Sequence, residues 1–418
     1  CAMLAILILF VIGYVLIMFE HQIKLDKAAS SLMMGVLMWV VCMFMPGQKE
    51  AALESLSHHL SDISGILFFL IGAMTIVELI DIYGGFEIIL AKITTTSKRV
   101  LLVIVTFISF FLSAVLDNLT TAIIMSSLVV KILPDSKDRR WLIAMIVIAA
   151  NAGGAWSPIG DVTTTMLWVG HQITVLGVIK ALYLPSLVAA LIPMGFILLR
   201  LQGQFIPRVY ETKGRSYPKE QTLILGLGMS LLLGVPIFKT ITHLPPFMGM
   251  MLAVGILWTV SETLHKRRPS VNDKPSAIFS ALEKIDMPSI LFFLGILLAV
   301  GALSQAGVLT QFAAWLTSIF PDSRLLLGSI GILSAIFDNV PLVAAVQGMF
   351  DIHQYPEGSF FWNFLAYCSG TGGSLLIIGS AAGVAAMGIE KIDFFWYLKH
   401  ISWIAGIGYL VGALVACL

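Results

Sequence analysis

Charged residues are scarce in this sequence. Asp, Glu, Lys and Arg make up only 12% of the 418 residues, whereas a soluble protein carries about 25%. This scarcity excludes an ordinary soluble protein, which needs a charged, solvated surface.

Cysteine is also rare. The four cysteines lie in or at the ends of apolar segments: Cys1, Cys42, Cys368 and Cys417. Their spacing fits neither a metal site nor a disulfide framework, so we interpret them as small buried hydrophobic side chains.

The sequence is instead rich in long hydrophobic runs. Hydrophobic residues make up 58% of the chain, and the mean hydropathy is +0.95. Several runs reach the ~20 residues that span a bilayer core. We therefore expect an all-α polytopic membrane protein, with the lipid bilayer as a partner and no nucleic acid. Hydropathy and helix-breaking residues predict full crossings near 2–19, 29–46, 63–81, 141–170, 175–200, 221–238, 246–265, 287–305, 361–389 and 395–417.

Two further apolar stretches are each split in the middle by an Asp-Asn pair: 100–133 by Asp117-Asn118 and 324–350 by Asp338-Asn339. The arms of the second stretch are too short to span the membrane at ~1.5 Å of rise per residue. We predict that both stretches are hairpins, which enter and leave the membrane on the same face. The longer arms of the first stretch leave two full crossings open as an alternative. Neither interpretation alters which side the chain reaches next.

The distribution of basic residues tests this topology. When the sides alternate along the chain, 21 of the 25 Lys and Arg residues fall on one side. Positive charge marks the cytoplasmic face, so that side is predicted to be cytoplasmic, and both termini of this chain lie outside. Glu78 and Asp81 then end the crossing at 63–81 near the cytoplasmic face. They form either an access path for cations and protons or a solvated helix end.

The sequence contains an internal repeat. The pentapeptide Ile66–Leu70 recurs at Ile290–Leu294, and the Asp-Asn pairs and two glycine-rich segments follow in the same order at nearly constant spacing. We predict a first repeat at 1–200, a linking loop at 201–220 and a second repeat at 221–418. Each repeat would hold five crossings, one of them a broken helix, and one hairpin. Because five is odd, the second repeat enters the membrane upside down, as in transporters that hold their substrate near the midplane.

The crossings at 141–170 and 361–389 are predicted to be the broken helices. Three glycines and Pro158 lie between Asn151 and Asp161, too many for a continuous helix. Irregular backbone at membrane depth is tolerated only where it faces protein or water, and its carbonyl and hydroxyl oxygens, together with the helix dipoles, suit an ion. The candidate ion- or proton-binding residues from the two breaks are Asn151, Ser157, Asp161, Thr163, Thr164, Ser369, Thr371 and Ser374.

Three carboxylates lie deepest in apolar sequence: Asp117, Asp161 and Asp338. A charge at the bilayer centre costs ~2.5–3.5 kcal/mol, which implies a polar cavity, a bound cation or protonation. Burial favours the protonated carboxyl group and a bound cation favours the carboxylate, so such a group can exchange a proton for a metal ion. Hard oxygen ligands suit Na⁺ or Li⁺. We predict that these three residues bind the ion, with Asn118 and Asn339 beside them.

Helix capping is the alternative role for Asp117 and Asp338, because Asp is a common N-cap residue. Asp161 differs from both, since its counterpart in the second repeat is Ser380 and the negative charge is not duplicated. Asp161 is therefore the leading candidate for the group that carries the exchanged proton.

Four segments in combination are specific to one family: Leu116–Thr121, Asn151–Thr164, Phe337–Pro341 and Gly370–Ser374. They resemble the NhaD-type sodium/proton antiporters of the ion transporter superfamily, and the resemblance covers nearly the whole chain. It implies a transporter, not an enzyme, that exchanges Na⁺ or Li⁺ for H⁺ in pH homeostasis, without a cofactor. It also implies a homodimer, an elevator-type movement and a bacterial inner membrane. The dicarboxylate branch has Ser-Asn-Thr at the hairpin tips, and Asp in place of that Ser favours a cation over an anion.

Two other functions stay open. The first is an anion carrier of the same superfamily, for arsenite or a carboxylate. The second is an intramembrane aspartyl protease that uses Asp117 and Asp161. The segment Pro158–Asp161 lacks the Gly-x-Gly-Asp pattern of such proteases, and Asp338 would have no role in one.

Overall fold

The computed structural model describes residues 2–45, 49–133, 135–206, 218–266, 276–336 and 338–418. Every named regular element in those ranges is a helix. Six of these helices are long and apolar enough to cross a membrane, or seven if the bent pair Val308–Ile319 and Ser323–Leu333 counts as one span. The prediction of an all-α polytopic membrane protein is confirmed. Phe337 and most of the predicted linking loop, 207–217, lie outside the described residues.

The helices that precede the linking loop are α1 (Ala2–Met18), α2 (Glu20–Ile23), α3 (Lys27–Met43), α4 (Lys49–Ile82), α5 (Gly85–Ala91), α6 (Lys98–Ser113), α7 (Asn118–Ile132), α8 (Ser136–Ala155), α9 (Val162–Val169) and α10 (Val175–Arg200). Helices α6 and α7 correspond to the first predicted hairpin, and α8 and α9 to the first predicted broken helix. Helix α4 contains 34 residues and begins well before the crossing predicted at 63–81.

The helices that follow the loop are α11 (Pro218–Thr242), α12 (Pro246–Lys266), α13 (Ala277–Lys284), α14 (Met287–Gln305), α15 (Val308–Ile319), α16 (Ser323–Leu333), α17 (Asn339–Met349), α18 (Phe360–Gly372), α19 (Ala381–Glu390), α20 (Phe394–Tyr397), a π-helical turn (Leu398–Ser402) and α21 (Trp403–Ala416). Helices α16 and α17 correspond to the second hairpin. Helix α13 precedes α14, and Ile278 and Ala281 are buried along it.

Both broken helices stay helical further than the glycines predict. Helix α8 includes Gly153 and Gly154, and its break is confined to Trp156–Asp161. Helix α18 likewise continues through Gly372. A Cβ atom at Gly153 would collide with the backbone carbonyl of Phe110 in α6. This glycine therefore permits two helices to approach closely, as small residues do in membrane proteins, and does not end the helix.

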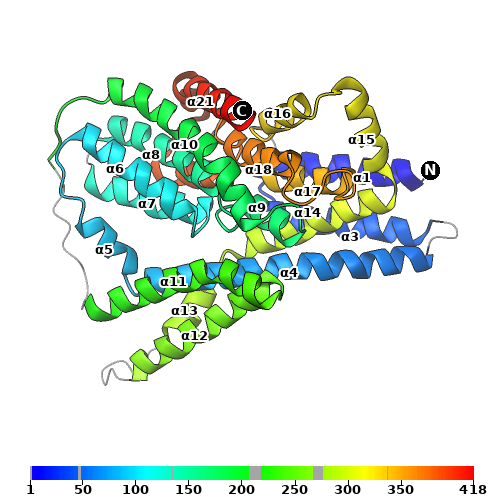
Figure 1. Ribbon diagram of the computed structural model, residues 1–418, viewed down its shortest axis with the longest axis horizontal. Helices are drawn as coiled ribbons and strands as arrows, with labels where there is room; N and C mark the ends of the chain where they lie inside the picture. Colours follow the sequence, from blue (N-terminus) through cyan, green and yellow to red (C-terminus); the bar gives the residue numbers. More distant parts are fainter. Residues whose placement is uncertain (1, 46–48, 134, 207–217, 267–275, 337) are drawn as a thin grey trace.

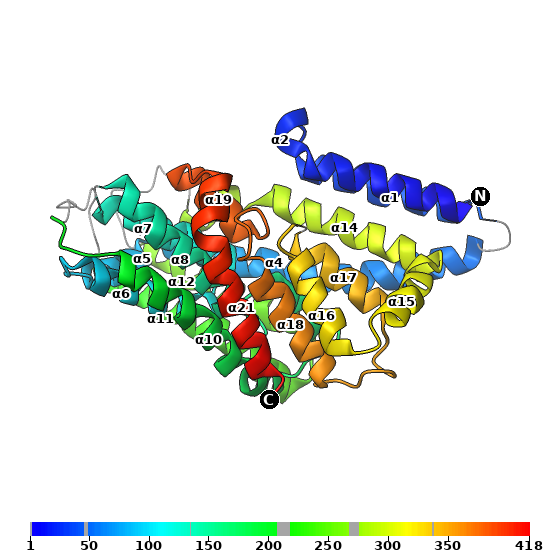
Figure 2. The ribbon, with the colours of Figure 1, turned by 90° about the horizontal axis from the view of Figure 1, so that it is seen from above.

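The helices form two groups, which we call the frame (α1, α3, α4, α11, α12 and α14) and the bundle (α6–α10 and α16–α21). In the frame, α14 packs along α3 and α12 packs along α4. Figure 1 shows α4 running along the frame with α11 and α12 beside it, and Figure 2 shows α1 at the outer edge, next to α14. In the bundle, α6 packs on α8, α16 on α18 and α10 on α21.

The frame helices α3 and α14 lie in close contact along their length. Gly35 and Gly295 lie at the crossing, where a Cβ atom at Gly295 would collide with the backbone of α3. The indole Nε1 of Trp39 donates a hydrogen bond to the Leu298 carbonyl at 2.8 Å. Within the bundle, α7 packs on α19 and α17 on α9, while α4 contacts α9 and α14 contacts α17. The starts of four half-helices therefore meet where the bundle faces the frame.

Candidate functional site

Four helices begin at this junction, and each begins with a polar cap. The residues that precede α7, α9, α17 and α19 are Asp117, Asp161, Asp338 and Ser380, and each side chain accepts a backbone N–H from its own helix. A helix N-terminus carries partial positive charge, and a carboxylate there gains about 0.3–1 kcal/mol. Capping is thus one role of Asp117 and Asp338, while ion binding by them stays a prediction.

Asp161 lies at the centre of the junction, and only 2% of its surface is exposed. Its Oδ1 accepts hydrogen bonds from the backbone N–H and the hydroxyl of Thr163, each at 2.9 Å. Its Oδ2 accepts a bond from Nδ2 of Asn118 at 2.8 Å, and Nδ2 of Asn339 lies 3.3 Å from the same oxygen. The asparagines of both hairpin tips therefore converge on one carboxylate. Flipping either amide would present an oxygen in place of the nitrogen, which is what a cation requires.

Asn151 connects the two broken helices. The residue is fully buried, with 0% of its surface exposed. Its Oδ1 accepts a hydrogen bond from Asn118 at 3.1 Å, and its Nδ2 lies 2.9 Å from the hydroxyls of both Ser374 and Ser380. One side chain thus joins a hairpin tip from the first half of the chain to the break in the second half.

The two flanking carboxylates have different surroundings. Asp117 accepts hydrogen bonds from the N–H and the hydroxyl of Thr120, at 2.7 and 2.8 Å. Its backbone has a φ of 138°, a conformation that costs a residue other than glycine about 1–3 kcal/mol. Asp338 accepts a bond from the N–H of Val340 at 3.3 Å, and its Oδ2 lies 3.9 Å from Nζ of Lys27.

Four of the predicted hydroxyl ligands donate to backbone carbonyls, and ion binding by their oxygens stays a prediction. The pairs are Ser157 with Ala114, Thr164 with Asp161, Ser369 with Leu365 and Thr371 with Tyr367. These bonds satisfy the hydroxyl groups inside or between helices. The structure thus brings Asp117, Asn118, Asn151, Asp161, Thr163, Asp338, Asn339 and Ser374 together, and it uses the other four hydroxyls in packing.

Two residues at the junction were not among the predicted site residues. Ser380 caps α19 with a backbone conformation nearly identical to that of Asp161, φ −145° against −147°, and the repeat comparison already paired the two. Lys27 offered no signal in the sequence beyond its positive charge, which was attributed to topology. Its closeness to Asp338 depends on packing between residues 311 positions apart and cannot be derived from local pattern.

A cavity of about 40 Å³ lies at the junction, enough for roughly one or two water-sized particles. All three carboxylates line it, together with Asn118, Asn339, Lys27 and the apolar side chains of Phe69 and Phe293. No group of three or more His, Cys, Asp and Glu in the described residues could hold a metal ion. A cation here would therefore rely on Asp161 with neutral oxygens, flanked by the two capping carboxylates.

A larger vestibule of about 710 Å³ adjoins the cavity, and both are lined by Lys27, Leu119, Ser289 and Ala381. Its ionisable lining is mostly acidic: Glu20, Asp26, Glu78, Asp81, Glu87 and Asp286 against Lys27, Lys131 and Lys284. Its lysines belong to the face that the distribution of Lys and Arg predicts to be cytoplasmic. The shared lining connects the site to this vestibule, where the acidic side chains concentrate cations.

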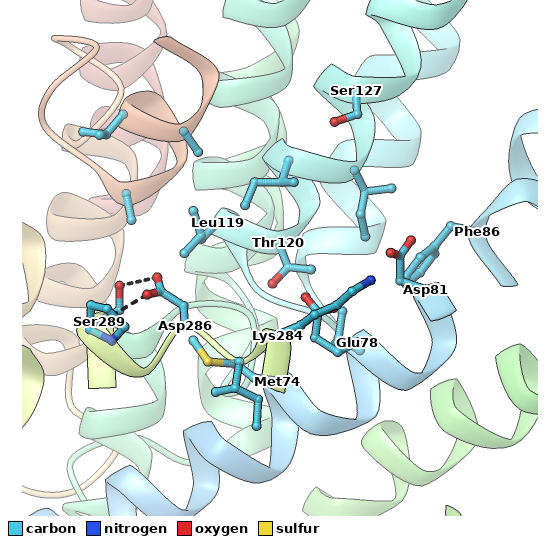
Figure 3. A pocket seen from close by; sticks show the side chains of 18 of the residues that line it. Met74, Glu78, Asp81, Phe86, Leu119, Thr120, Ser127, Lys284, Asp286 and Ser289 are labelled. Atoms are coloured by element: carbon cyan, nitrogen blue, oxygen red, sulfur yellow. Dashed lines mark hydrogen bonds between the residues drawn. The ribbon is translucent and has the colours of Figure 1, made fainter. Parts of the chain in front are cut away.

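Glu78 and Asp81 of α4 point into this vestibule (Figure 3). Lys284 extends across Glu78 toward Asp81 in the same view, and both residues interact electrostatically with Glu78. Asp286, which caps α14, accepts a bond from the Ser289 hydroxyl at 2.5 Å. Both interpretations of Glu78 and Asp81 place their carboxylates in this vestibule, and the access path stays a prediction.

Comparison with known proteins gives a consistent set of relatives. The citrate-transporter family matches residues 14–362. The chain is 45% identical to a protein of Arabidopsis thaliana named sodium/proton antiporter 1, over 98% of this chain and 71% of the relative. It is 43% identical to sodium/proton antiporter 2 of the same plant, over 97% of each. A Vibrio cholerae protein named Na⁺/H⁺ antiporter NhaD is 32% identical, over 97% of this chain and 90% of the relative.

Proposed function

The chain belongs to the citrate-transporter family and, within it, to the NhaD-type antiporters, and on this premise we propose that it exchanges Na⁺ or Li⁺ for H⁺ across a membrane. The observation that carries the proposal is the buried carboxylate of Asp161, which lines a cavity too small for more than one or two water-sized particles. A cation or a proton neutralises this group, and the site exchanges one for the other.

The cavity does not suit an anion such as citrate. Four helix N-termini converge on it and would attract negative charge, but Asp117, Asp161 and Asp338 already supply that charge at three of them. A tricarboxylate would also need far more than the roughly 40 Å³ available. The same features disfavour arsenite or a smaller carboxylate in this form of the protein. The family name therefore describes the fold, and the site residues select the ion.

The strain at Asp117 also favours an ion-related role. A residue needed only as a cap would adopt a negative φ, as Asp338 and Asp161 do at −54° and −147°. Asp117 instead has a φ of 138°. Strain of this kind collects at functional sites, where the surrounding structure compensates for it. We propose that Asp117 is held there to place its negative charge beside the cavity.

In the proposed cycle, Na⁺ enters from the acidic vestibule and reaches Asp161, whose proton leaves to water. The amides of Asn118 and Asn339 then turn their oxygens to the ion.

We further propose that the bundle moves against the frame as an elevator in a homodimer. The matched packing of α14 on α3 and of α12 on α4 supports the inverted repeats that such movement needs. The relatives come from plants and bacteria, so the bacterial inner membrane and the outside termini stay predictions.

The proposal is tested in proteoliposomes that contain a pH dye. Addition of Na⁺ should dissipate an imposed pH gradient with the wild type and not with Asp161→Asn. Because the proton and Na⁺ compete for one carboxylate, the apparent KM for Na⁺ should rise as the pH falls. Asp322→Asn is the matched control, since Asp322 also caps a helix, α16, but is exposed and remote from the cavity. Equal activity of wild type and Asp161→Asn would refute the proposal.

A further inference from the structure

Lys27 is the first residue of α3, and its side chain reaches from the frame to the tip of the second hairpin. Its Nζ lies 3.9 Å from Oδ2 of Asp338 and 4.6 Å from the ring centroid of Phe292. The side chains of Lys27 and Asp338 are 29% and 22% exposed. The ammonium group is thus held in a defined, half-buried position by a carboxylate and an aromatic face.

Local helix energetics do not account for a lysine at this position. A cation in the first turn of a helix is disfavoured by the helix dipole, and α3 already has a cap, because Asp26 accepts a bond from the N–H of Ala28 at 2.8 Å. Positive charge on the cytoplasmic side accounts for a lysine in this region, but not for its contact with Asp338. Lys27 is also the one basic residue that lines both the cavity and the vestibule in the described structure.

We propose that Lys27 is a tethered cation that occupies the Asp338 side of the cavity when no Na⁺ is bound, and that the transported cation must compete with it. This inference rests on the proposed function and adds a residue that sets its affinity. The ammonium and Na⁺ carry the same charge, and both are attracted to the carboxylates of one small cavity. When Na⁺ binds, Lys27 is expected to move back toward the acidic vestibule, where Asp26 and Asp286 also line the wall.

The proposal predicts the direction in which the Lys27 charge changes the affinity for Na⁺. Two like charges a few ångströms apart repel strongly in a partly buried site, so Lys27 weakens the binding of Na⁺ from the vestibule. Removing its charge should strengthen that binding. Damage to the fold would weaken binding instead, so the direction of the change separates competition from a merely structural role.

The experiment compares three variants in proteoliposomes and in a Na⁺-dependent thermal protection assay. Lys27→Met keeps the apolar stem on Phe292 and removes the charge, and the apparent KM for Na⁺ should fall about tenfold. Lys27→Arg keeps the positive charge over the Phe292 ring and should stay within about twofold of the wild type. Lys284→Gln removes a vestibule lysine that does not line the cavity. An equal fall in KM for Lys284→Gln would assign the effect to the general potential of the vestibule and overturn the proposal.

A second measurement uses the wild-type protein and does not depend on whether the variants fold. Labelling of the Lys27 amine by an acylating reagent, quantified by peptide mass spectrometry, should increase with NaCl and not with choline chloride. No Na⁺-dependent change in this labelling, or an unchanged or higher KM in Lys27→Met, would refute the inference. Neither result would touch the proposed function, which is tested separately by Na⁺-driven proton movement in the wild type and by the loss of that movement in Asp161→Asn.

Discussion

At the residue scale, the single buried side chain of Asn151 holds parts of both halves of the chain together. It has 0% exposure and hydrogen-bond partners in a hairpin tip and in the opposite broken helix. Replacing it with Ala would leave the hydroxyls of Ser374 and Ser380 without this partner, at a cost of about 1–3 kcal/mol. We expect Asn151→Ala to lower the unfolding temperature in detergent and to reduce Na⁺/H⁺ exchange severely.

Asn363 provides the matched control for that variant. It is also buried, at 5% exposure, but its amide donates to the carbonyls of Gly358 and Ser359 within the same segment. Asn363→Ala should therefore lower the unfolding temperature without raising the KM for Na⁺. If both variants lose Na⁺/H⁺ exchange equally, the effect of Asn151 on transport is a consequence of lost stability alone.

The polar residues that meet at the junction could be predicted from sequence because burying them in the membrane is energetically costly. Asp161 and the two Asp-Asn pairs are expensive in apolar segments, and the repeat places them in corresponding positions. The hydroxyls of Ser157, Ser369 and Thr371 could not be separated by sequence from those that lie at the junction, because a hydroxyl can donate to a nearby carbonyl in any helix. Contacts such as Lys27 with Asp338 depend on how the frame docks against the bundle, which no local pattern encodes.

At the scale of the helices, the glycines of α8 and α18 show where sequence reasoning reaches its limit. A glycine lowers helix stability by about 1 kcal/mol relative to Ala, so a cluster of glycines predicts a break. The same residue is also needed where two backbones touch, and Gly153 and Gly372 serve that purpose against α6 and α16. The breaks begin only at Trp156 and Gly373. Propensity alone cannot distinguish these two uses.

Gly153→Ala tests this assignment. The added methyl group would collide with the Phe110 carbonyl and push α6 away from α8, which displaces the Asp117 tip from Asp161. We expect a loss of about 1–3 kcal/mol of stability, seen as a lower unfolding temperature, and little remaining exchange. Gly226→Ala in α11 is the control, because nothing lies within 4 Å of a Cβ atom there. It should be neutral or slightly stabilising through helix propensity, and a functional Gly153→Ala protein would contradict the close-approach role.

At the scale of the whole molecule, the proposed elevator movement would take place at the junction between the frame and the bundle. The vestibule opens between Met74 on α4 in the frame and Leu119 on α7 in the bundle (Figure 3). If the bundle slides as one body, a link across this boundary must stop transport, whereas a link inside the bundle must not. Movement of the hairpins alone would make links inside the bundle inhibitory as well.

Paired cysteines can distinguish these movements, in a background from which the native cysteines have been removed. Met74→Cys with Leu119→Cys, joined by cross-linkers of graded length, should block exchange with the shortest reagents and release it as the linker lengthens. The control pair replaces Lys98 and Asp138, an ion pair at 2.5 Å between α6 and α8 of the bundle. Cross-linking this pair should leave the exchange rate within about twofold of the uncross-linked variant, because both helices would travel together. Inhibition by the control link would show that α6 and α8 move relative to each other, and the elevator proposal would then give way to a hairpin gate.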